Sequence, residues 1–330
     1  MIISQTPYRV SFAGGGTDLP AFYTREAGAV LSVGLNHHMY VTVSPRFKAS
    51  TRVAYTKTEI CDSIDDIQHT IAREALRMTG LGKHLEITTI GDVPAGTGLG
   101  SSSSLAVGLL SALYAYKGQI ASPSKLAEES CKIEIDILKK PIGRQDQYAA
   151  AYGSLNYIKF NPDHSVYVEP VPYRPVTLAE LEERTLLLYT QQQRDADKIL
   201  VQQSAGTQKK DKFTILKAMR DLAGEMREAI SGEGDLDAFA ELLHEGWLLK
   251  RSLGFGITNS GIDEWYEAAR KAGAQGGKLL GAGGGGFLLL VAPPERHDTI
   301  RAALGNPQEI DFKIDRRGSR IIFISDRYSF

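Results

Sequence analysis

The chain has 330 residues, and its 38 lysines and arginines against 39 aspartates and glutamates leave a formal net charge of −1. This length predicts about two domains, and a composition with 42% hydrophobic and 23% charged residues excludes a disordered chain, while the near-zero charge argues against a nucleic-acid binder. The first residues lack a signal-peptide pattern, and the longest apolar run, residues 287–292, is too short for a membrane span, so we expect a cytoplasmic protein without a membrane partner.

The first half of the chain mixes strands with helices. Runs rich in β-branched and aromatic residues predict strands, and apolar residues at helical spacing, such as Ile67, Ile71 and Ala75, predict helices. Ser122 and Pro123 are typical of a helix start, which we expect to run to about Lys140. We expect strands over residues 8–13, 30–43, 84–89 and 154–160, and helices over residues 65–79, 101–117, 122–140 and 145–152.

The second half follows a proline-rich stretch, residues 170–175, which is the best candidate for a linker. Strands and helices alternate here without a regular strand–helix–strand repeat, as they do in the first half, and this indicates an α+β fold in both halves. We expect strands over residues 185–190, 286–291, 309–314 and 320–325, and helices over residues 212–230, 236–249 and 262–272.

Glycine is in excess, with 33 residues, or 10% of the chain, where about 7% is ordinary. The excess is concentrated in three short stretches, residues 14–16, 91–100 and 276–286. Glycine is used where the backbone takes conformations closed to other residues or must approach another group closely. The clustering therefore predicts a functional site that is built from loops.

The middle cluster has the features of a phosphate-binding loop. Residues 94–104, Pro-Ala-Gly-Thr-Gly-Leu-Gly-Ser-Ser-Ser-Ser, join a predicted strand to a predicted helix. Glycines let backbone N–H groups close around an anion, and the helix N-terminus adds unpaired donors. A capped helix after a glycine turn would explain one glycine and one serine, but not the whole run. The loop lacks the Gly-Lys-Ser/Thr of a Walker motif and the third glycine of a dinucleotide fingerprint.

The motif Pro-x-x-x-Gly-Leu-Gly-Ser-Ser resembles the ATP loop of the GHMP kinases. Residues 6–18 resemble the first motif of that superfamily, and residues 278–286 resemble its third, in the right order along the chain. The resemblance implies an ATP-dependent kinase of the α+β class. It implies a ribosomal-protein-S5-like, ATP-binding and catalytic domain, which we place at residues 1–172, and a ferredoxin-like C-terminal domain at residues 173–330.

The same resemblance implies roles for residues around a reacting centre. Ser102 and Glu134 would hold Mg²⁺, and Asp146 would accept or orient the substrate proton. Arg9 would make Asp146 or the hydroxyl more acidic, or neutralise the γ-phosphate. The alternative reading is that Glu134 and Asp146 are two solvated helix carboxylates. The nucleotide would contact Pro94, Gly96, Gly98, Leu99, Gly100, Ser101, Ser102 and Ser103.

The implied acceptor is a sugar phosphate. Gly15 and Gly16 stand where galactokinases carry a glutamate and a histidine, which indicates a larger sugar that is approached by backbone. Residues 12–20 resemble the branch that phosphorylates D-glycero-D-manno-heptose 7-phosphate at its anomeric hydroxyl, giving the 1,7-bisphosphate for nucleotide-activated heptose and surface polysaccharide. The resemblance places the sugar against Gly14, Gly15, Gly16, Thr17, Asp18, Asp146, Gly283 and Gly284.

Other interpretations stay open at this point. The chain could be a 1-kinase for another sugar, such as fucose or galactose, or a non-enzymatic sensor of sugar and nucleotide, although Ser102 and Asp146 are intact. Residues 281–286 also fit a dinucleotide fingerprint, but a predicted strand follows them where a helix is needed. Arg194 could meet a substrate phosphate or lie on the surface, and the protein could form a homo-oligomer.

Overall fold

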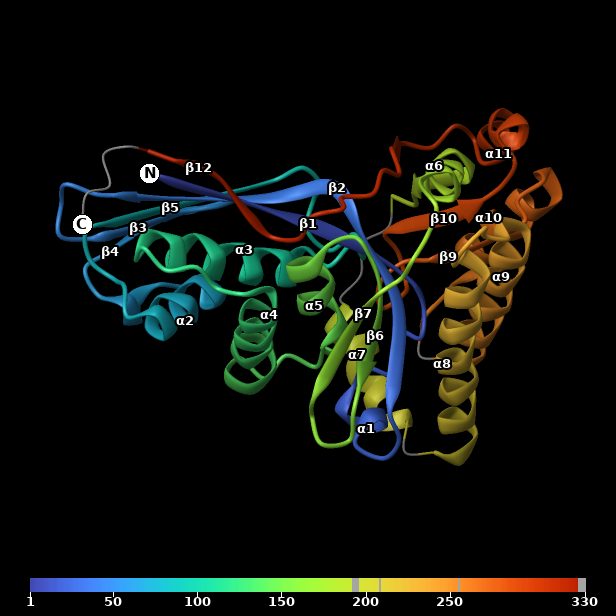
Figure 1. The fold of residues 1–330 in the computed structure, drawn as a ribbon, viewed down its shortest axis with the longest axis horizontal. Helices are drawn as coiled ribbons and strands as arrows, with labels where there is room; N and C mark the ends of the chain where they lie inside the picture. Colours follow the sequence, from blue (N-terminus) through green and yellow to red (C-terminus); the bar gives the residue numbers. More distant parts are fainter. Residues whose placement is uncertain (192–195, 208, 255, 326–330) are drawn as a thin grey trace.

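The computed structural model describes residues 1–191, 196–207, 209–254 and 256–325, and two β-sheets organise it. The larger sheet has eight strands, with the order β12-β1-β2-β5-β3-β4, and β6 and β7 extend it from β2 (Figure 1). Its strands are β1 (Ile2–Ala13), β2 (Gly28–Pro45), β3 (Thr51–Ala54), β4 (Thr58–Cys61), β5 (Leu85–Gly91), β6 (Leu155–Phe160), β7 (Val166–Pro170) and β12 (Arg320–Ile324).

Strand β2 is long enough to pair with two different strands along its edge opposite β1. Its first part, from Gly28 to Val33, pairs with β6, and its last part, from Met39 to Pro45, pairs with β5. The alternation of buried and partly exposed residues along its last part fits a sheet that is covered on one face. The loop after β1 is therefore attached to a long antiparallel pair of strands, β1 and β2.

Helices cover one face of the larger sheet, below it in Figure 1. Buried β2 residues such as Val41 and Val43 share a core with Leu109, Leu110 and Leu113 of α3, which is enclosed on nearly all sides. This confirms a buried helix at the position that its small and apolar residues predict. The helices are α2 (Thr70–Thr79), α3 (Ser101–Tyr116), α4 (Pro123–Cys131), a π-helix (Lys132–Ile137) and α5 (Gln145–Tyr152), and a short helix, α1 (Pro20–Tyr23), follows β1.

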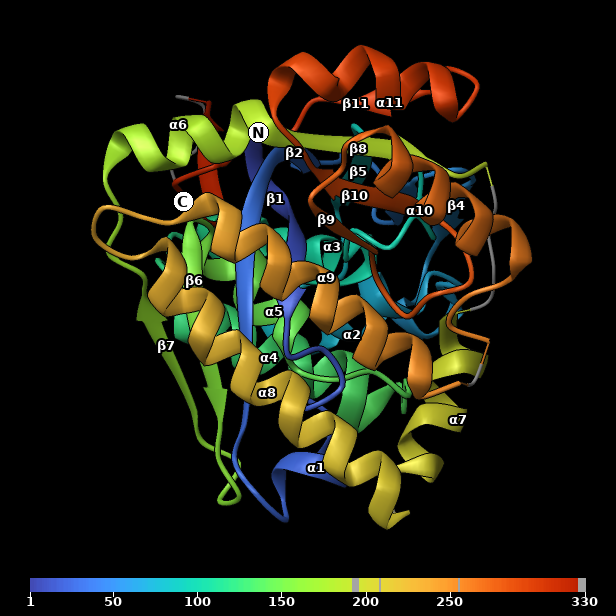
Figure 2. The same cartoon turned by 90° about the vertical axis from the view of Figure 1, so that its right-hand side faces the viewer.

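The second sheet has four antiparallel strands in the order β11-β8-β10-β9. Helices α8 and α9 pack side by side, and α8 lies against β2 of the larger sheet (Figure 2). The elements are β8 (Thr185–Tyr189), β9 (Gly276–Leu279), β10 (Phe287–Val291), β11 (Glu309–Ile310), α6 (Pro175–Arg184), α7 (Ala196–Gly206), α8 (Lys210–Ile230), α9 (Leu236–Ser252), α10 (Ser260–Ala272) and α11 (His297–Ala303), with short 3₁₀ turns at Ile64–Asp66 and Pro294–Arg296.

Most predicted elements are confirmed, and the differences have local causes. The helix predicted from residue 65 begins only at Thr70, because Ile64–Asp66 form a 3₁₀ turn and the His69 side chain caps the helix proper. The helix expected to reach Lys140 passes into the π-helix at Lys132 and ends at Ile137. The strands β3, β4, β7 and β9 and the helices α1, α6, α7 and α11 were not predicted.

The division of the chain at residues 172 and 173 stays a prediction. The proline-rich stretch does separate β7, the last strand before it, from α6, which begins at Pro175. However, β12 pairs antiparallel with β1, and Leu35 forms a β-bridge with Ile314. The last part of the described chain therefore returns to the larger sheet after the second sheet is complete.

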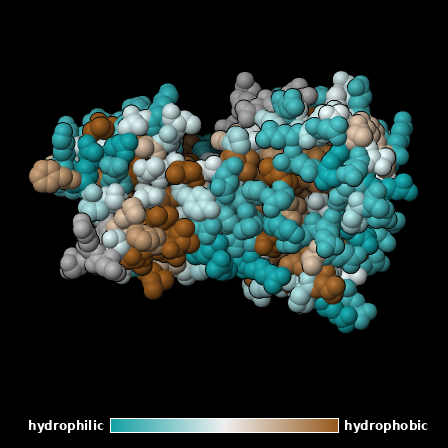
Figure 3. Space-filling view, turned by 90° about the horizontal axis from the view of Figure 1, so that it is seen from above, coloured by the Kyte–Doolittle hydropathy of each residue, from teal (hydrophilic) through white to brown (hydrophobic). Residues whose placement is uncertain are grey.

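Strand β12 forms an exposed apolar edge. Ile322, Phe323 and Ile324 are each about half exposed, and hydrophobic side chains gather over this end of the face shown in Figure 3. A homo-oligomer stays a prediction. Among the described residues, no helix is both long and apolar enough to cross a membrane.

Candidate active site

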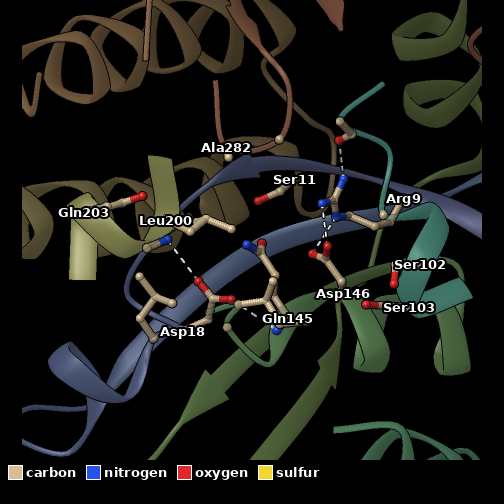
Figure 4. Close-up of a pocket in the computed structure, with 18 of the residues that line it drawn as sticks. Arg9, Ser11, Asp18, Ser102, Ser103, Gln145, Asp146, Leu200, Gln203 and Ala282 are labelled. Carbon is tan, nitrogen blue, oxygen red and sulfur yellow. Dashed lines mark hydrogen bonds and ion pairs between the residues drawn. The ribbon is translucent and has the colours of Figure 1, made fainter. Parts of the chain in front are cut away.

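A cavity of about 260 Å³ lies where loops of the two sheets meet, and stretches far apart in the sequence line it. Its walls come from β1 and the loop after it, the glycine loop before α3, the segment from the π-helix to α5, helices α7 to α9, and the β9–β10 loop. Figure 4 shows Arg9 and Asp146 near the middle, with Ser102 and Ser103 on one side and Asp18 on the other. The site is therefore an elongated cleft with a charged centre.

The glycine loop places the N-terminus of α3 at one end of the cavity. Gly96, Gly98 and Gly100 all have positive φ, and Gly100 is the residue before the helix. The residues of the first helical turn line the cavity, and the unpaired N–H groups of such a turn can bind an anion. The cavity is lined here by Gly96, Gly98, Gly100, Ser101, Ser102 and Ser103.

Pro94 and Leu99 shape this loop from behind. The Pro94 carbonyl accepts a hydrogen bond from the Thr97 hydroxyl at 2.9 Å. The Leu99 side chain is buried in the core, and its carbonyl accepts a hydrogen bond from the backbone N–H of Arg9 at 3.1 Å. Neither residue lines the cavity among the described residues, so both support the loop, and their contact with nucleotide stays a prediction.

Glu134 is fully buried and lies beside the start of α3. Its Oε1 accepts hydrogen bonds from Ser102 Oγ at 2.6 Å and from Lys140 Nζ at 3.0 Å, and its Oε2 accepts from Ser103 Oγ and Gln147 Nε2, both at 2.7 Å. Glu134 lies in the π-helix that follows α4. The alternative of a solvated helix carboxylate is therefore wrong for Glu134, which has a donor on every side.

Lys140 stands in the position that was predicted for a metal ion. Its Nζ lies 2.6 Å from Ser102 Oγ and 3.0 Å from Glu134 Oε1, so it bridges the two predicted ligands. The oxygen atoms of this pair thus face a place that a cation can occupy. They are also of the kind that Mg²⁺ prefers, and Mg²⁺ commonly takes only one or two protein ligands besides phosphate and water. The residues fit the metal, provided that Lys140 withdraws.

Arg9 and Asp146 form a bidentate ion pair at the centre of the cavity. Arg9 Nε and Nη2 each donate to one oxygen of Asp146 at 2.7 Å, and Nη1 donates to the Gly98 carbonyl at 2.6 Å. Asp146 lies in the first turn of α5, where the helix dipole favours a negative charge. Strand β1, helix α5 and the glycine loop are thereby joined by one guanidinium group.

Asp18 lies at the other end of the cavity and is buried. Its Oδ1 accepts a hydrogen bond from Gly16 N–H at 2.9 Å, and its Oδ2 accepts from Gln145 N–H at 3.2 Å. Burial, followed by the charge of Asp146, raises the pKa of Asp18 to about 6. Because the neighbouring residue of Gln145 is Asp146, the start of α5 positions both carboxylates of the site.

In the loop after β1, some residues line the cavity and others hold the shape of the loop. Gly15 and Gly16 line the cavity, whereas Gly14 and Thr17 do not among the described residues. The Thr17 hydroxyl is buried and donates to the carbonyls of Gly14 and Ala29. Gly14 has a positive φ of 83°, and a side chain there would collide with the Ala29 carbonyl. These two residues therefore fix the shape of the loop.

The third glycine cluster meets the cavity at a different point from the one expected. Gly281 and Ala282 line it, but Gly283 and Gly284 do not among the described residues. Gly284 N–H instead donates to the Ile257 carbonyl at 2.8 Å, and a Cβ on Gly283 would collide with Ile257 backbone atoms. The structure therefore places these two glycines against the loop before α10.

Several lining residues were not singled out from the sequence. Ser11 Oγ and Gln145 Oε1 are buried and have no hydrogen-bond partner within the described part of the chain. Lys250, Lys278 and Gln203 also face the cavity, and all three come from elements of the second half. Ser11 and Lys278 lay inside recognised motifs and Gln145 lay beside Asp146, whereas Lys250 and Gln203 carried no local signal. Arg194 lies outside the described residues.

The amino-acid sequence matches two family models. Residues 67–154 match the model of the GHMP kinases N terminal domain, and residues 223–309 match the model of the GHMP kinases C terminal. The two matches together cover more than half of the chain. They include the α3 loop, the predicted metal ligand Glu134 and the predicted catalytic residue Asp146.

Individual proteins resemble the chain over nearly its full length. It is 28% identical to the D-glycero-alpha-D-manno-heptose 7-phosphate kinase of Campylobacter jejuni subsp. jejuni serotype O:2, over 96% of this chain and 97% of that protein. It is 26% identical to the bifunctional fucokinase/GDP-fucose pyrophosphorylase of Arabidopsis thaliana over 94% of this chain, which spans only 32% of that protein. The crystal structure of a D-glycero-D-manno-heptose 1-phosphate kinase from Bacteriodes thetaiotaomicron matches with a TM-score of 0.81 and 26% identity, over 99% of this chain and 100% of that one.

Proposed function

This chain belongs to the GHMP kinases, and from that premise we propose that it transfers the γ-phosphoryl group of ATP to the anomeric hydroxyl of D-glycero-D-manno-heptose 7-phosphate. The chain is a sugar kinase, a phosphotransferase with an alcohol group as acceptor. The observation that carries the proposal is the Arg9–Asp146 pair, which stands between an anion-binding helix N-terminus and the buried carboxylate of Asp18. The cavity thus offers a place for phosphate, a place for a polyol, and a proton acceptor between them.

The proposed transfer uses each part of this centre. The anomeric oxygen forms a bond to the γ-phosphorus, the bond from that phosphorus to the β,γ-bridging oxygen breaks, and ADP leaves with the electron pair. The hydroxyl proton passes to Asp146. Although Arg9 donates to both Asp146 oxygens, each carboxylate oxygen has a second lone pair that can accept the proton. Arg9 also places a positive charge beside the oxygens on which negative charge develops.

Mg²⁺ belongs to this proposal through Ser102 and Glu134. These two side chains would hold the ion, and its charge would neutralise negative charge that develops on the phosphates. The protein's own part is to hold the Glu134 carboxylate rigidly, which the donors from Ser103 and Gln147 do. The Lys140 ammonium, once displaced from Glu134, would remain close to the phosphates.

The sugar end of the cavity supports a polyol with more groups than a hexose. A Cβ on Gly15 would lie 3.8 Å from Gln145 Nε2 and 4.0 Å from Ser11 Oγ, so the absent side chain leaves open space between two polar groups. The unpartnered Ser11 hydroxyl and the Gln145 carbonyl oxygen can each bond a sugar hydroxyl. Asp18 can accept from two adjacent hydroxyls. The relatives that are heptose phosphate kinases agree with this assignment.

A second candidate is a 1-kinase for fucose, because fucokinases of Arabidopsis thaliana and Bacteroides fragilis are 26% and 27% identical to the chain over more than 90% of its length. The test is ADP release from ATP with a panel of acceptors: D-glycero-D-manno-heptose 7-phosphate, L-fucose, D-galactose and D-mannose 6-phosphate. We expect turnover with the heptose 7-phosphate and a 1,7-bisphosphate product by phosphorus NMR. Turnover with a free hexose or fucose but not with the heptose 7-phosphate would overturn the heptose assignment. If none of the acceptors gave turnover, a sensor would be favoured.

Replacing Lys140 by methionine is expected to tighten the binding of Mn²⁺, measured by EPR without nucleotide, by about tenfold. The reason is that the ammonium and the metal compete for Glu134 Oε1 and Ser102 Oγ. The adjacent and exposed Lys139 provides the matched control, because Lys139→Met should leave Mn²⁺ binding unchanged. Equal or weaker Mn²⁺ binding by Lys140→Met would refute this competition.

The raised pKa of Asp18 predicts how sugar use depends on pH. Asp18 accepts sugar hydroxyls as the carboxylate, so protonation below its pKa of about 6 removes that acceptor. We expect kcat/KM for the sugar to fall by about tenfold per pH unit below that value, since this ratio reports groups of the free enzyme. An Asp18→Asn variant should have a low kcat/KM without this inflection. A wild-type profile that stays level from pH 7 to pH 5 would count against the role of Asp18.

A further inference from the structure

Lys250 is a buried lysine on the wall of the cavity, and neither the motifs nor the proposed mechanism uses it. It lies in the last turn of α9 and is only 7% exposed. Its Nζ donates to the carbonyl of Gly281 at 2.6 Å and to that of Leu279 at 3.3 Å. The side chain thus reaches from α9 to the β9–β10 loop, which lines the cavity.

The charge of Lys250 has no carboxylate partner at ion-pair distance within the described residues. The charged groups that face it are cations, Arg9 from β1 and Lys278 from β9. Burial, and then the charge of Arg9, lowers the pKa of Lys250 to about 8. A buried ammonium that is compensated only by carbonyl groups is costly, and an arriving anion would relieve that cost.

The contact between two glycine loops brings Lys250 to the same part of the cavity as Arg9. A Cβ on Gly281 would lie 2.6 Å from the Cα of Gly98, so the loops touch at this point without side chains between them. Arg9 Nη1 donates to the Gly98 carbonyl on one side of the contact, and Lys250 Nζ donates to the Gly281 carbonyl on the other. The two cations therefore flank the contact, and both line the cavity.

Lys278 differs from Lys250 although both are buried. Its Nζ donates to the carbonyls of Ser11 and Phe12 at 2.8 and 2.9 Å, at the end of β1. Those bonds tie β9 to the strand before the Gly14–Gly16 loop, which is a supporting position. Lys250 is instead joined to the glycine loop that meets the nucleotide loop, so it is the better placed of the two to touch phosphate.

We propose that the Lys250 ammonium binds the phosphoryl group that is transferred, together with Arg9 and from the opposite side of the Gly98–Gly281 contact. This inference rests on the proposed kinase function and adds a catalytic residue from the C-terminal half to it. The ammonium donates to phosphoryl oxygens and neutralises charge on them while the phosphorus passes between the two oxygens. It is the third phosphate-directed cation beside Arg9 and Lys140.

The test is to compare the binding of AMP-PNP and ADP, each with Mg²⁺ and without sugar, by calorimetry. Lys250→Met should weaken AMP-PNP binding by about 10- to 100-fold, the usual effect of a charge-assisted hydrogen bond, and ADP binding by less than about threefold. The control is Arg251→Met on the same helix, because Arg251 pairs with Asp263 and Glu267 and does not line the cavity. This control should leave both affinities unchanged.

A second variant separates phosphate binding from support of the loop. Wild-type affinity for AMP-PNP should fall above about pH 8 as Lys250 loses its proton, whereas Lys250→Arg should bind AMP-PNP well and show no such fall. Equal loss of ADP and AMP-PNP binding in Lys250→Met, or no loss of either, would overturn the proposal. If the nucleotide affinities changed as expected but the heptose 7-phosphate gave no ADP release, only the proposed acceptor would be refuted. If the wild-type protein bound neither AMP-PNP nor ADP, the proposed kinase activity itself would be refuted.

Discussion

Replacing Asp146 by asparagine is expected to lower kcat by about 10² to 10⁴, the range that a positioned general base contributes. The amide keeps the size of the side chain and one oxygen for Arg9, but it cannot take the hydroxyl proton. Asp146 contacts neither the first turn of α3 nor the Ser102–Glu134 pair through a hydrogen bond in the described structure. Nucleotide affinity should therefore change little.

The measurement is ADP release at saturating ATP and acceptor, together with calorimetry of ADP. Asp136→Asn is the matched control, because Asp136 lies in the π-helix that precedes α5 but is exposed and does not line the cavity. It should keep its kcat. If Asp146→Asn retained more than about a tenth of the wild-type kcat, positioning alone would explain the rate and the proton-acceptor role would be abandoned.

Replacing Gly143 by alanine is expected to lower kcat/KM for the sugar by about 100-fold or more, since a misplacement of about 1 Å at a reacting centre has effects of this size. A Cβ at this position would collide with the Asp18 carboxylate and would lie 2.9 Å from the Asp18 carbonyl oxygen. The backbone oxygen cannot move aside as the end of a flexible side chain can. Because Gln145 N–H holds Asp18 and Asp146 follows it, the change would displace both carboxylates.

Circular dichroism and thermal unfolding would establish that Gly143→Ala is folded, and calorimetry should show ADP binding close to that of the wild type. Gly224→Ala in α8 is a suitable control, because its nearest neighbour would be the Tyr157 hydroxyl at 3.8 Å. That variant should keep its sugar kinetics. Wild-type kcat/KM in Gly143→Ala would show that the position of Asp18 does not control sugar use.

Local chemistry made a large part of this protein predictable from the sequence. Gly96, Gly98 and Gly100 indicated a loop with positive φ, and Ser101 indicated the helix that follows, because turn conformations and helix starts depend on neighbouring residues. The same holds for Ser122 as a helix cap and for α5 between Gln145 and Gly153. The α+β class followed from the irregular mixture of predicted strands and helices and the family from three motifs in order, and both are confirmed.

The unpredicted strands show where local signals end. Strands β3 and β4 have four residues each, and β3 is held to β5 by parallel pairing across more than 30 residues of chain. Strand β12 was predicted as a strand over residues 320–325, but its pairing with β1, at the opposite end of the described sequence, was not. Short strands carry little periodicity, and their partners supply the hydrogen bonds that define them.

Some charged groups of the site could be predicted from the sequence, and others could not. The resemblance to the GHMP kinase motifs singled out Arg9, Asp18, Glu134 and Asp146, and the structure gathers them around one cavity. Only the tertiary structure set Lys140 between Ser102 and Glu134, and brought Lys250 to Gly281, 31 residues away. It also put Gly281 and Ala282 at the cavity in place of Gly283 and Gly284. The sequence motifs contain the residues that phosphoryl transfer requires. The lysines that surround those residues are placed by the packing of helix ends and loops, and no local sequence pattern encodes that packing.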